Sequence, residues 1–208
     1  LHKEYRRQRQ MCIRDRNASK RITARCCSCV HQRQTNRRKE GVSVIETVDD
    51  IKTIANVGTG TMGHAITLQF ALSGYPVHLV GRGEASLEKA MKAIRSDAED
   101  FAEAGLLKDG DTLDAVLARI TGYADYASGV ADVDFVIESV AENLDIKKSV
   151  WAAVAHAAPK DAILSTNTSG LSPTALQSVL KKPERFVVAH FWNPAQLMPL
   201  VEVVPGEK

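Results

Sequence analysis

The amino-acid sequence predicts an α/β protein built on a doubly wound, mainly parallel β-sheet. Short apolar runs alternate with longer stretches of helical periodicity from about residue 49 to residue 208. Such alternation favours parallel strands whose connecting helices cover both faces of the sheet. A glycine-rich turn joins the first apolar run to the first helical stretch, and polar clusters follow several later runs. In sheets of this kind, ligands bind beyond the carboxyl ends of the strands.

Each predicted element has its own local signal. The strands are apolar runs, and glycine or proline residues such as Gly74 and Pro159 mark where helices end. The predicted strands cover residues 54–57, 77–80, 134–137, 162–165, 186–189 and 200–204. The predicted helices are one that ends at Gly74 and four more at residues 84–107, 112–119, 143–158 and 173–180.

The long helix at residues 84–107 has apolar side chains along one face, which include Leu87, Ile94 and Phe101. A Lys-Asp-Gly-Asp turn separates it from the shorter helix at residues 112–119. Two helices joined in this way between strands predict a helical hairpin insertion that projects from the sheet. The alternative is a packed crossover.

The turn after the first strand has the spacing of a dinucleotide-binding loop, Gly58-x-Gly60-x-x-Gly63. In this spacing the first glycine permits a tight turn, the second lets a pyrophosphate approach the backbone, and the third lets helix and strand pack closely. N–H groups at the start of the helix would then face the phosphates. We therefore predict a Rossmann-like cofactor site that includes Thr61 and Met62. The alternative is a turn that closes a βα unit without a ligand.

The charge is distributed very unevenly along the chain. Residues 1–40 hold 13 of the 27 lysines and arginines but only 3 of the 25 acidic residues, so the remainder of the chain is acidic. We predict two parts, a basic and disordered extension at residues 1–42 and a folded domain at residues 49–208. The extension is consistent with an organelle leader or with an arm for nucleic acid or lipid. Its string MCIRDR, at Met11–Arg16, is also similar to a translated sequencing adaptor, so we assign the extension no function and expect no nucleic-acid partner.

All four cysteines lie in the extension, and the predicted domain has none, so no disulfide framework supports it. Cys26-Cys27-x-Cys29-x-His31 is too crowded for a zinc site and has no second ligand pair, so we expect no metal. No apolar run approaches the ~20 residues of a membrane helix, so we expect no membrane partner. These features predict a cytoplasmic protein, or a mitochondrial one if the extension is a leader.

Polar clusters follow three of the predicted strands. They are Glu138-Ser139 with Glu142 and Lys147, then Ser165 to Ser169, then His190 to Pro194. His190 is a candidate acid–base catalyst because Glu202 lies on the following strand, where a carboxylate could hold one imidazole tautomer and stabilise the protonated ring. We expect the other histidines of the domain, His64, His78 and His156, to lack comparable partners and to be structural.

Four of these motifs occur in the order and form that identify a known family. The glycine turn with Met62, the segment ESVAEN at Glu138–Asn143 with Lys147, STNTSGL at Ser165–Leu171, and HFWNPAQLMPLVEVV at His190–Val204 resemble the L-3-hydroxyacyl-CoA dehydrogenase family. The resemblance covers the NAD-binding domain, over about residues 50–208. It implies NAD as cofactor, an acyl-CoA substrate, and oxidation of the 3-hydroxyl group in fatty-acid β-oxidation or butanoate metabolism.

The resemblance also implies roles for individual residues. His190 matches the catalytic histidine that accepts the hydroxyl proton, and Glu202 matches its paired carboxylate. Ser169 matches a serine that contacts both substrate and cofactor. The remaining cofactor contacts that it implies are Asn193, Glu142 and Lys147.

One position departs from the family pattern at the end of the second strand. The family places an acid there to bind the adenosine ribose, whereas this chain has Gly81 followed by Arg82. Loss of the carboxylate and gain of a guanidinium is the change expected where a 2′-phosphate is accommodated. NADP is therefore an alternative to NAD. In the other interpretation Arg82 stacks on adenine and NAD still binds.

A second departure is that the chain stops just after the last predicted strand, where the family continues into a helical domain. That domain completes the acyl-CoA cleft and forms a homodimer in the complete protein. We therefore expect an N-terminal fragment that binds dinucleotide but is weakly active or inactive. The alternatives are a dehydrogenase of a free hydroxy acid, similar to gulonate dehydrogenases and lambda-crystallins, and a dinucleotide-binding domain without turnover.

Overall fold

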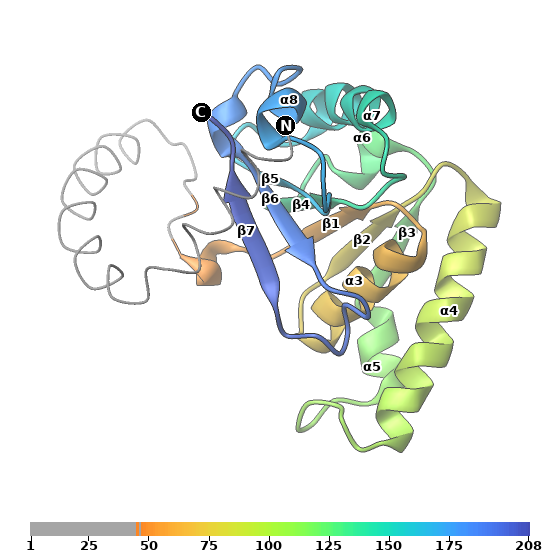
Figure 1. Cartoon of the computed structure of the whole chain (residues 1–208). Helices are drawn as coiled ribbons and strands as arrows, with labels where there is room; N and C mark the ends of the chain where they lie inside the picture. The colour runs from red at the N-terminus through yellow and green to blue at the C-terminus, as the bar shows by residue number, and fades with distance from the viewer. Residues whose placement is uncertain (1–44, 46) are drawn as a thin grey trace, which may run out of the picture. The chain divides into compact units, whose positions relative to one another are not determined.

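A computed structural model describes residue 45 and residues 47–208 (Figure 1). The expectations for residues 1–42, including the four cysteines, lie outside the described residues. The strands are β1 (Ile54–Val57), β2 (Val77–Val80), β3 (Ile120–Tyr123), β4 (Phe135–Glu138), β5 (Ile163–Thr166), β6 (Phe186–Phe191) and β7 (Val201–Pro205). The helices are α3 (Thr61–Leu72), α4 (Glu84–Glu103), α5 (Leu113–Ala118), α6 (Tyr126–Gly129), α7 (Leu144–Ala157) and α8 (Pro173–Gln177), with 3-10 turns at Val48–Asp50 and Pro183–Arg185.

The strands form one seven-stranded sheet in the order β3-β2-β1-β4-β5-β6-β7. All neighbouring strands are parallel except β6 and β7, which are antiparallel. The chain therefore progresses outward from β1 in one direction and from β4 in the other, which makes the β1–β4 boundary the topological switch point. This arrangement confirms the predicted doubly wound, mainly parallel fold.

The helices cover both faces of the sheet (Figure 1). On one face, α7 and α8 bury Trp151 and Leu176 in a cluster that includes Val136 of β4. On the opposite face, α3 buries Ile66 against a cluster that includes Ile137, the next residue of β4. Neighbouring residues of a strand point to opposite faces, so a strand covered on both sides is largely apolar. Burying each large apolar side chain contributes about 1.5–3 kcal/mol.

The predicted helical hairpin is formed by α4 and α5, and its buried face packs on α3. Leu87 and Ile94 of α4 lie in one cluster with Leu68 of α3 and Val116 of α5. The connection between the two helices is exposed at Leu106. The hairpin is therefore anchored by its apolar face, whereas its connecting turn and the charged face of α4 are exposed.

Several predicted boundaries were wrong. The first long helix ends at Glu103 rather than residue 107, because Gly105 adopts φ 67° and stops it. The helix predicted to reach residue 180 ends at Gln177. Two short elements, β3 and α6, were not predicted, since β3 contains only one buried side chain, Ile120, and α6 is a single turn.

The register of the sheet aligns the ends of its central strands. Val57 of β1 pairs with Val80 of β2 and with Glu138 of β4, and Glu138 pairs in turn with Thr166 of β5. The carboxyl ends of four strands therefore lie level at one edge, which is where the fold places ligands. Within the described residues, no helix is both long and apolar enough to cross a membrane.

Candidate functional site

The three glycines between β1 and α3 have different structural roles. Gly58 has φ 132°, and a Cβ added there would lie 2.7 Å from the backbone of Ser139. A Cβ on Gly63 would lie 2.1 Å from the carbonyl oxygen of Gly58. At Gly60, by contrast, an added Cβ would meet nothing within 4 Å. Gly58 and Gly63 are therefore required to close the turn against its neighbours, whereas Gly60 leaves space beside the backbone.

Asn56 holds this turn from within the sheet, and sequence reasoning did not find it. Its fully buried side-chain amide donates to the carbonyl oxygens of Gly58 and Gly63, both at 2.9 Å, and lies 3.1 Å from the Thr67 hydroxyl. Ser139 Oγ donates to Asn56 Oδ1 at 2.8 Å. The sequence did contain a signal for this role, because Asn56 is a polar residue inside an apolar strand. A buried amide must find hydrogen-bond partners, so such a residue is expected to bind neighbouring backbone groups.

A cavity of about 730 Å³ opens beside the glycine turn, between the starts of α3 and α4 and the loop after β4. Five of the predicted cofactor residues line it, namely Gly58, Gly60, Thr61, Met62 and Arg82. The first N–H groups of a helix have no intrahelical partner and favour anions. The unfilled space at Gly60 and the helix start beside it therefore fit the pyrophosphate of a dinucleotide.

The other predicted residues do not line this cavity. Gly63 lies against the carbonyl oxygen of Gly58 within the turn. The remaining six lie in the loops after β4 and β5, in the first turn of α7, at or just after the end of β6, and at the start of β7. Three of them, Glu142, Lys147 and Ser169, belong to a hydrogen-bond and ion-pair network around Glu138 and Glu142. Two others, His190 and Glu202, form a separate pair. The six are Glu142, Lys147, Ser169, His190, Asn193 and Glu202.

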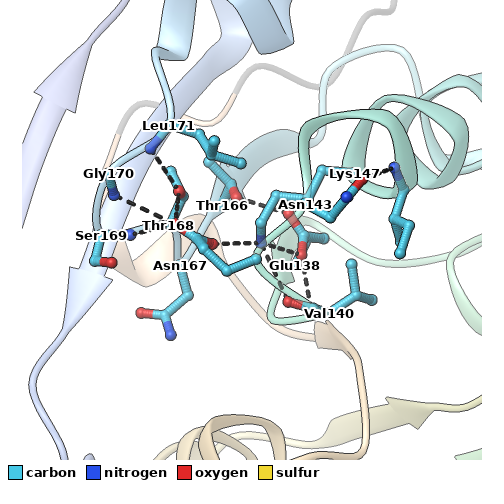
Figure 2. Close-up of polar contacts among 12 residues, drawn as sticks. Glu138, Val140, Asn143, Lys147, Thr166, Asn167, Thr168, Ser169, Gly170 and Leu171 are labelled. Atoms are coloured by element: carbon cyan, nitrogen blue, oxygen red, sulfur yellow. Dashed lines mark hydrogen bonds and ion pairs between the residues drawn. The ribbon is translucent and has the colours of Figure 1, made fainter.

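Lys147 and Glu138 form a fully buried ion pair at the end of β4 (Figure 2). The ammonium nitrogen of Lys147 lies 2.7 Å from Glu138 Oε1 and 3.3 Å from the carbonyl oxygen of Val140. Thr166 donates its hydroxyl proton to Glu138 Oε2 at 2.6 Å. The lysine predicted to contact the cofactor thus lies against protein groups, including Glu142 Oε2 at 3.5 Å. Removing either buried charge would leave the other uncompensated.

Glu142 organises the loop that carries Ser169. Its Oε1 accepts hydrogen bonds from the Thr168 hydroxyl and from the backbone N–H groups of Ser169, at 3.1 Å, and Gly170, at 3.3 Å. Partial burial raises the pKa of the Glu142 carboxyl, but the hydrogen bonds and the charge of Lys147 outweigh it and hold the pKa below its ordinary value. Glu142 is therefore a carboxylate that fixes the loop after β5.

His190 and Glu202 face each other across the antiparallel pair β6–β7, where they are register partners. The distance from His190 Nδ1 to Glu202 Oε2 is 2.9 Å, and both side chains are half-buried. Because a carboxylate only accepts, this contact places the imidazole proton on Nδ1 and leaves Nε2 able to accept a proton. Asn167 Oδ1 accepts from the N–H of Phe191 at 2.7 Å and so ties the loop after β5 to this strand. Asn193 follows β6 and is exposed.

One of the other histidines, His64, does have a comparable carboxylate partner, so the expectation that all three lack one was wrong for this residue. His64 Nε2 lies 3.3 Å from Asp97 Oδ2, to which Gln196 also donates at 3.0 Å. His78 Nδ1 instead lies 3.0 Å from the carbonyl oxygen of Gly129, and the exposed Asp132 carboxylate is 3.9 Å away. His64 additionally lines the cavity beside the glycine turn. These partners come from segments distant in the chain, which local sequence patterns do not reveal.

Within the described residues, no group of three or more histidine, cysteine, aspartate or glutamate side chains could hold a metal ion. The arrangement that is present combines a dinucleotide-sized cavity at the switch point with an imidazole that can exchange a proton at the same edge of the sheet. The fold and site together define a Rossmann-type oxidoreductase domain.

The chain belongs to the 3-hydroxyacyl-CoA dehydrogenase family. The family's NAD binding domain matches residues 53–208. The chain is similar to the fatty acid oxidation complex subunit alpha of Pseudomonas putida, with 37% identity over 166 residues, which are 78% of this chain and 22% of that protein. It thus spans less than a quarter of the length of this curated relative.

Two solved structures show the same fold. The 3-hydroxybutyryl-CoA dehydrogenase of Escherichia coli K12 has 35% identity and a TM-score of 0.69, over 74% of this chain and 32% of that chain. The (S)-3-hydroxybutyryl-CoA dehydrogenase of Ralstonia eutropha has 32% identity and a TM-score of 0.71, over 76% of this chain and 55% of that chain. Both similarities extend over most of the residues that the structure describes.

Proposed function

We propose that this chain is the dinucleotide-binding part of an enzyme that oxidises L-3-hydroxyacyl-CoA to 3-oxoacyl-CoA. The observation that carries the proposal is the contact between His190 and Glu202, which lies at the same sheet edge as the glycine turn. Alcohol oxidation needs a base for the hydroxyl proton beside an acceptor for the hydride. The membership of the chain in a hydroxyacyl-CoA dehydrogenase family supports this substrate class.

In this proposal His190 is the acid–base residue. Its Nε2 accepts the proton of the 3-hydroxyl group while Nδ1–H stays bonded to Glu202. Glu202 is a positioning residue that fixes the tautomer and stabilises the imidazolium as it forms. The bound nicotinamide dinucleotide supplies the hydride acceptor. In the reverse direction the protonated His190 returns the proton to the oxygen of the 3-oxo group.

The remaining predicted residues position cofactor and substrate. We propose that Gly60, Thr61 and Met62 contact the pyrophosphate, and that Ser169 and Asn193 contact the nicotinamide end and the substrate. Glu142 supports this end because it binds the backbone of the loop that carries Ser169. Lys147 acts indirectly, since its ammonium group contacts Glu138 and Glu142.

The test has two stages on the 208-residue chain. Fluorescence titration with NADH and NADPH first establishes whether a dinucleotide binds. Oxidation of 3-hydroxybutyryl-CoA and of free 3-hydroxybutyrate is then compared for the chain and for His190→Gln. The proposal expects any turnover to depend on the thioester and on His190. Equal rates with the free acid would favour the alternative of a free hydroxy-acid dehydrogenase, and turnover that is unchanged in His190→Gln would contradict the role assigned to His190.

A further inference from the structure

The start of α4 brings basic side chains to the cavity beside the glycine turn. Arg82, in the turn before the helix, lines this cavity together with Ser86 and Lys89 of the helix itself. Arg82 and Lys89 are exposed, and neither forms a hydrogen bond or ion pair with another of the described residues. Two cationic side chains are thus available to an anion at this end of the cavity.

The described residues that line the cavity include no aspartate or glutamate. Two acidic residues are close in sequence. Glu84, in the first turn of α4, is exposed and outside the lining, and Glu88 is bound to Lys92 at 2.7 Å on another part of the same helix. Nothing on the lining therefore neutralises Arg82 and Lys89.

Gly81, at the end of β2, occupies the position where Rossmann domains that bind NAD place an acid for the ribose diol. A Cβ at Gly81 would lie 2.9 Å from Ser86 Oγ and 3.0 Å from Thr59 Cγ2. The carboxylate is therefore absent, and the surrounding side chains also leave little space for one. A free 2′-hydroxyl has no carboxylate to bind here, whereas a 2′-phosphate meets two cations.

We propose that this cavity selects the 2′-phosphorylated dinucleotide, NADP(H), over NAD(H). Arg82 binds the phosphomonoester through the planar guanidinium group, and Lys89 adds a second positive charge from the next turn of α4. This inference rests on the proposed dinucleotide site and concerns only the adenosine end of the ligand. It assigns to Lys89 a role that the glycine motif does not imply.

The test compares NADPH with NADH binding to the 208-residue chain by fluorescence titration, and 2′,5′-ADP with 5′-AMP as competitors. NADPH should bind more tightly, and Arg82→Gln should weaken NADPH binding by about ten- to a hundredfold, the effect of losing hydrogen bonds to a charged group. Lys89→Gln should act in the same direction, with little change for NADH. Lys92→Gln is the matched control, because Lys92 lies on the same helix outside the cavity.

Each outcome separates this inference from the proposed function. NADH binding as tight as NADPH binding, or tighter, would overturn the selectivity and leave the dinucleotide site intact. Equal losses for both dinucleotides in Arg82→Gln would overturn the phosphate contact. Failure to bind either dinucleotide would instead overturn the proposed function. Arg82, Lys89 and Lys92 are all exposed, so these substitutions leave the core unchanged.

Discussion

Two halves of the functional edge are built in different ways. The half formed by β1 and α3 relies on the backbone, because Gly58 and Gly63 permit contacts that any Cβ would prevent. The half formed by the ends of β4, β5 and β6 relies on charged side chains, above all Lys147 and Glu138, which are fully buried. We call the first half backbone-built and the second half side-chain-built. The stability of the backbone-built half should fall when a side-chain atom is added, whereas the stability of the side-chain-built half should fall when a charge is removed or the pH changes. Substitutions in each half can test this contrast.

The largest effect is expected at His190. His190→Gln keeps a similar shape but removes the group that accepts the proton, so oxidation of 3-hydroxybutyryl-CoA should slow by about a hundred- to ten-thousand-fold. Dinucleotide affinity should change little, since His190 lies outside the cavity lining. Steady-state kinetics with a parallel binding titration measure both quantities. His156→Gln, at an exposed position on α7, is the control. A similar loss in both variants would contradict a catalytic role for His190.

Lys147→Met should cause the largest loss of stability in the side-chain-built half. The substitution retains the apolar stem but leaves Glu138 without its cation, which costs about 3–5 kcal/mol for a buried pair. Chemical denaturation at neutral pH measures the free energy of unfolding. Lys148→Met, the neighbouring position on α7, should change it by less than about 0.5 kcal/mol. If both variants were equally stable, the buried pair would not organise this half.

Gly63→Ala and Gly60→Ala test the backbone-built half with the same added methyl group. At Gly63 the new Cβ would meet the Gly58 carbonyl oxygen at 2.1 Å, so the free energy of unfolding should fall by about 1–3 kcal/mol or more. At Gly60 the space is open, so stability should be nearly unchanged while dinucleotide affinity falls. Thermal denaturation and binding titration distinguish the two. Equal destabilisation by both substitutions would show that the glycines do not differ in role.

The smallest expected effect is the pH dependence of the contribution that Glu142 makes to stability. The pKa of Glu142 is lowered in the folded protein, so its contribution to stability is complete above the unfolded-state pKa, about 4.5, and is lost as the pH falls through the folded-state pKa. Wild type should therefore be more stable than Glu142→Gln near neutral pH, and the difference should shrink below about pH 4.5. Denaturation at a series of pH values measures it. A difference that grows on acidification would contradict the assigned direction.

Local chemistry made much of the fold and site predictable. The strand-turn-helix signal located the glycine turn correctly because its requirements lie within a few consecutive residues. The pairing of His190 with Glu202 could be anticipated because both lie on strands adjacent in the chain. Element boundaries were less accurate, as at Gly105, where the positive φ that ends α4 decides the limit.

The sequence by itself determined the alternation that makes a parallel sheet, the position of the glycine turn and the pairing of His190 with Glu202. Only the tertiary structure decided that Gly60 is open while Gly63 is closed, and that Lys147 is buried against Glu138. It also decided that His64 meets Asp97, and that Arg82 and Lys89 share one cavity. The physical reason is that local patterns depend on neighbours in the chain, whereas burial and charge pairing depend on the sheet register and helix packing that bring distant segments together.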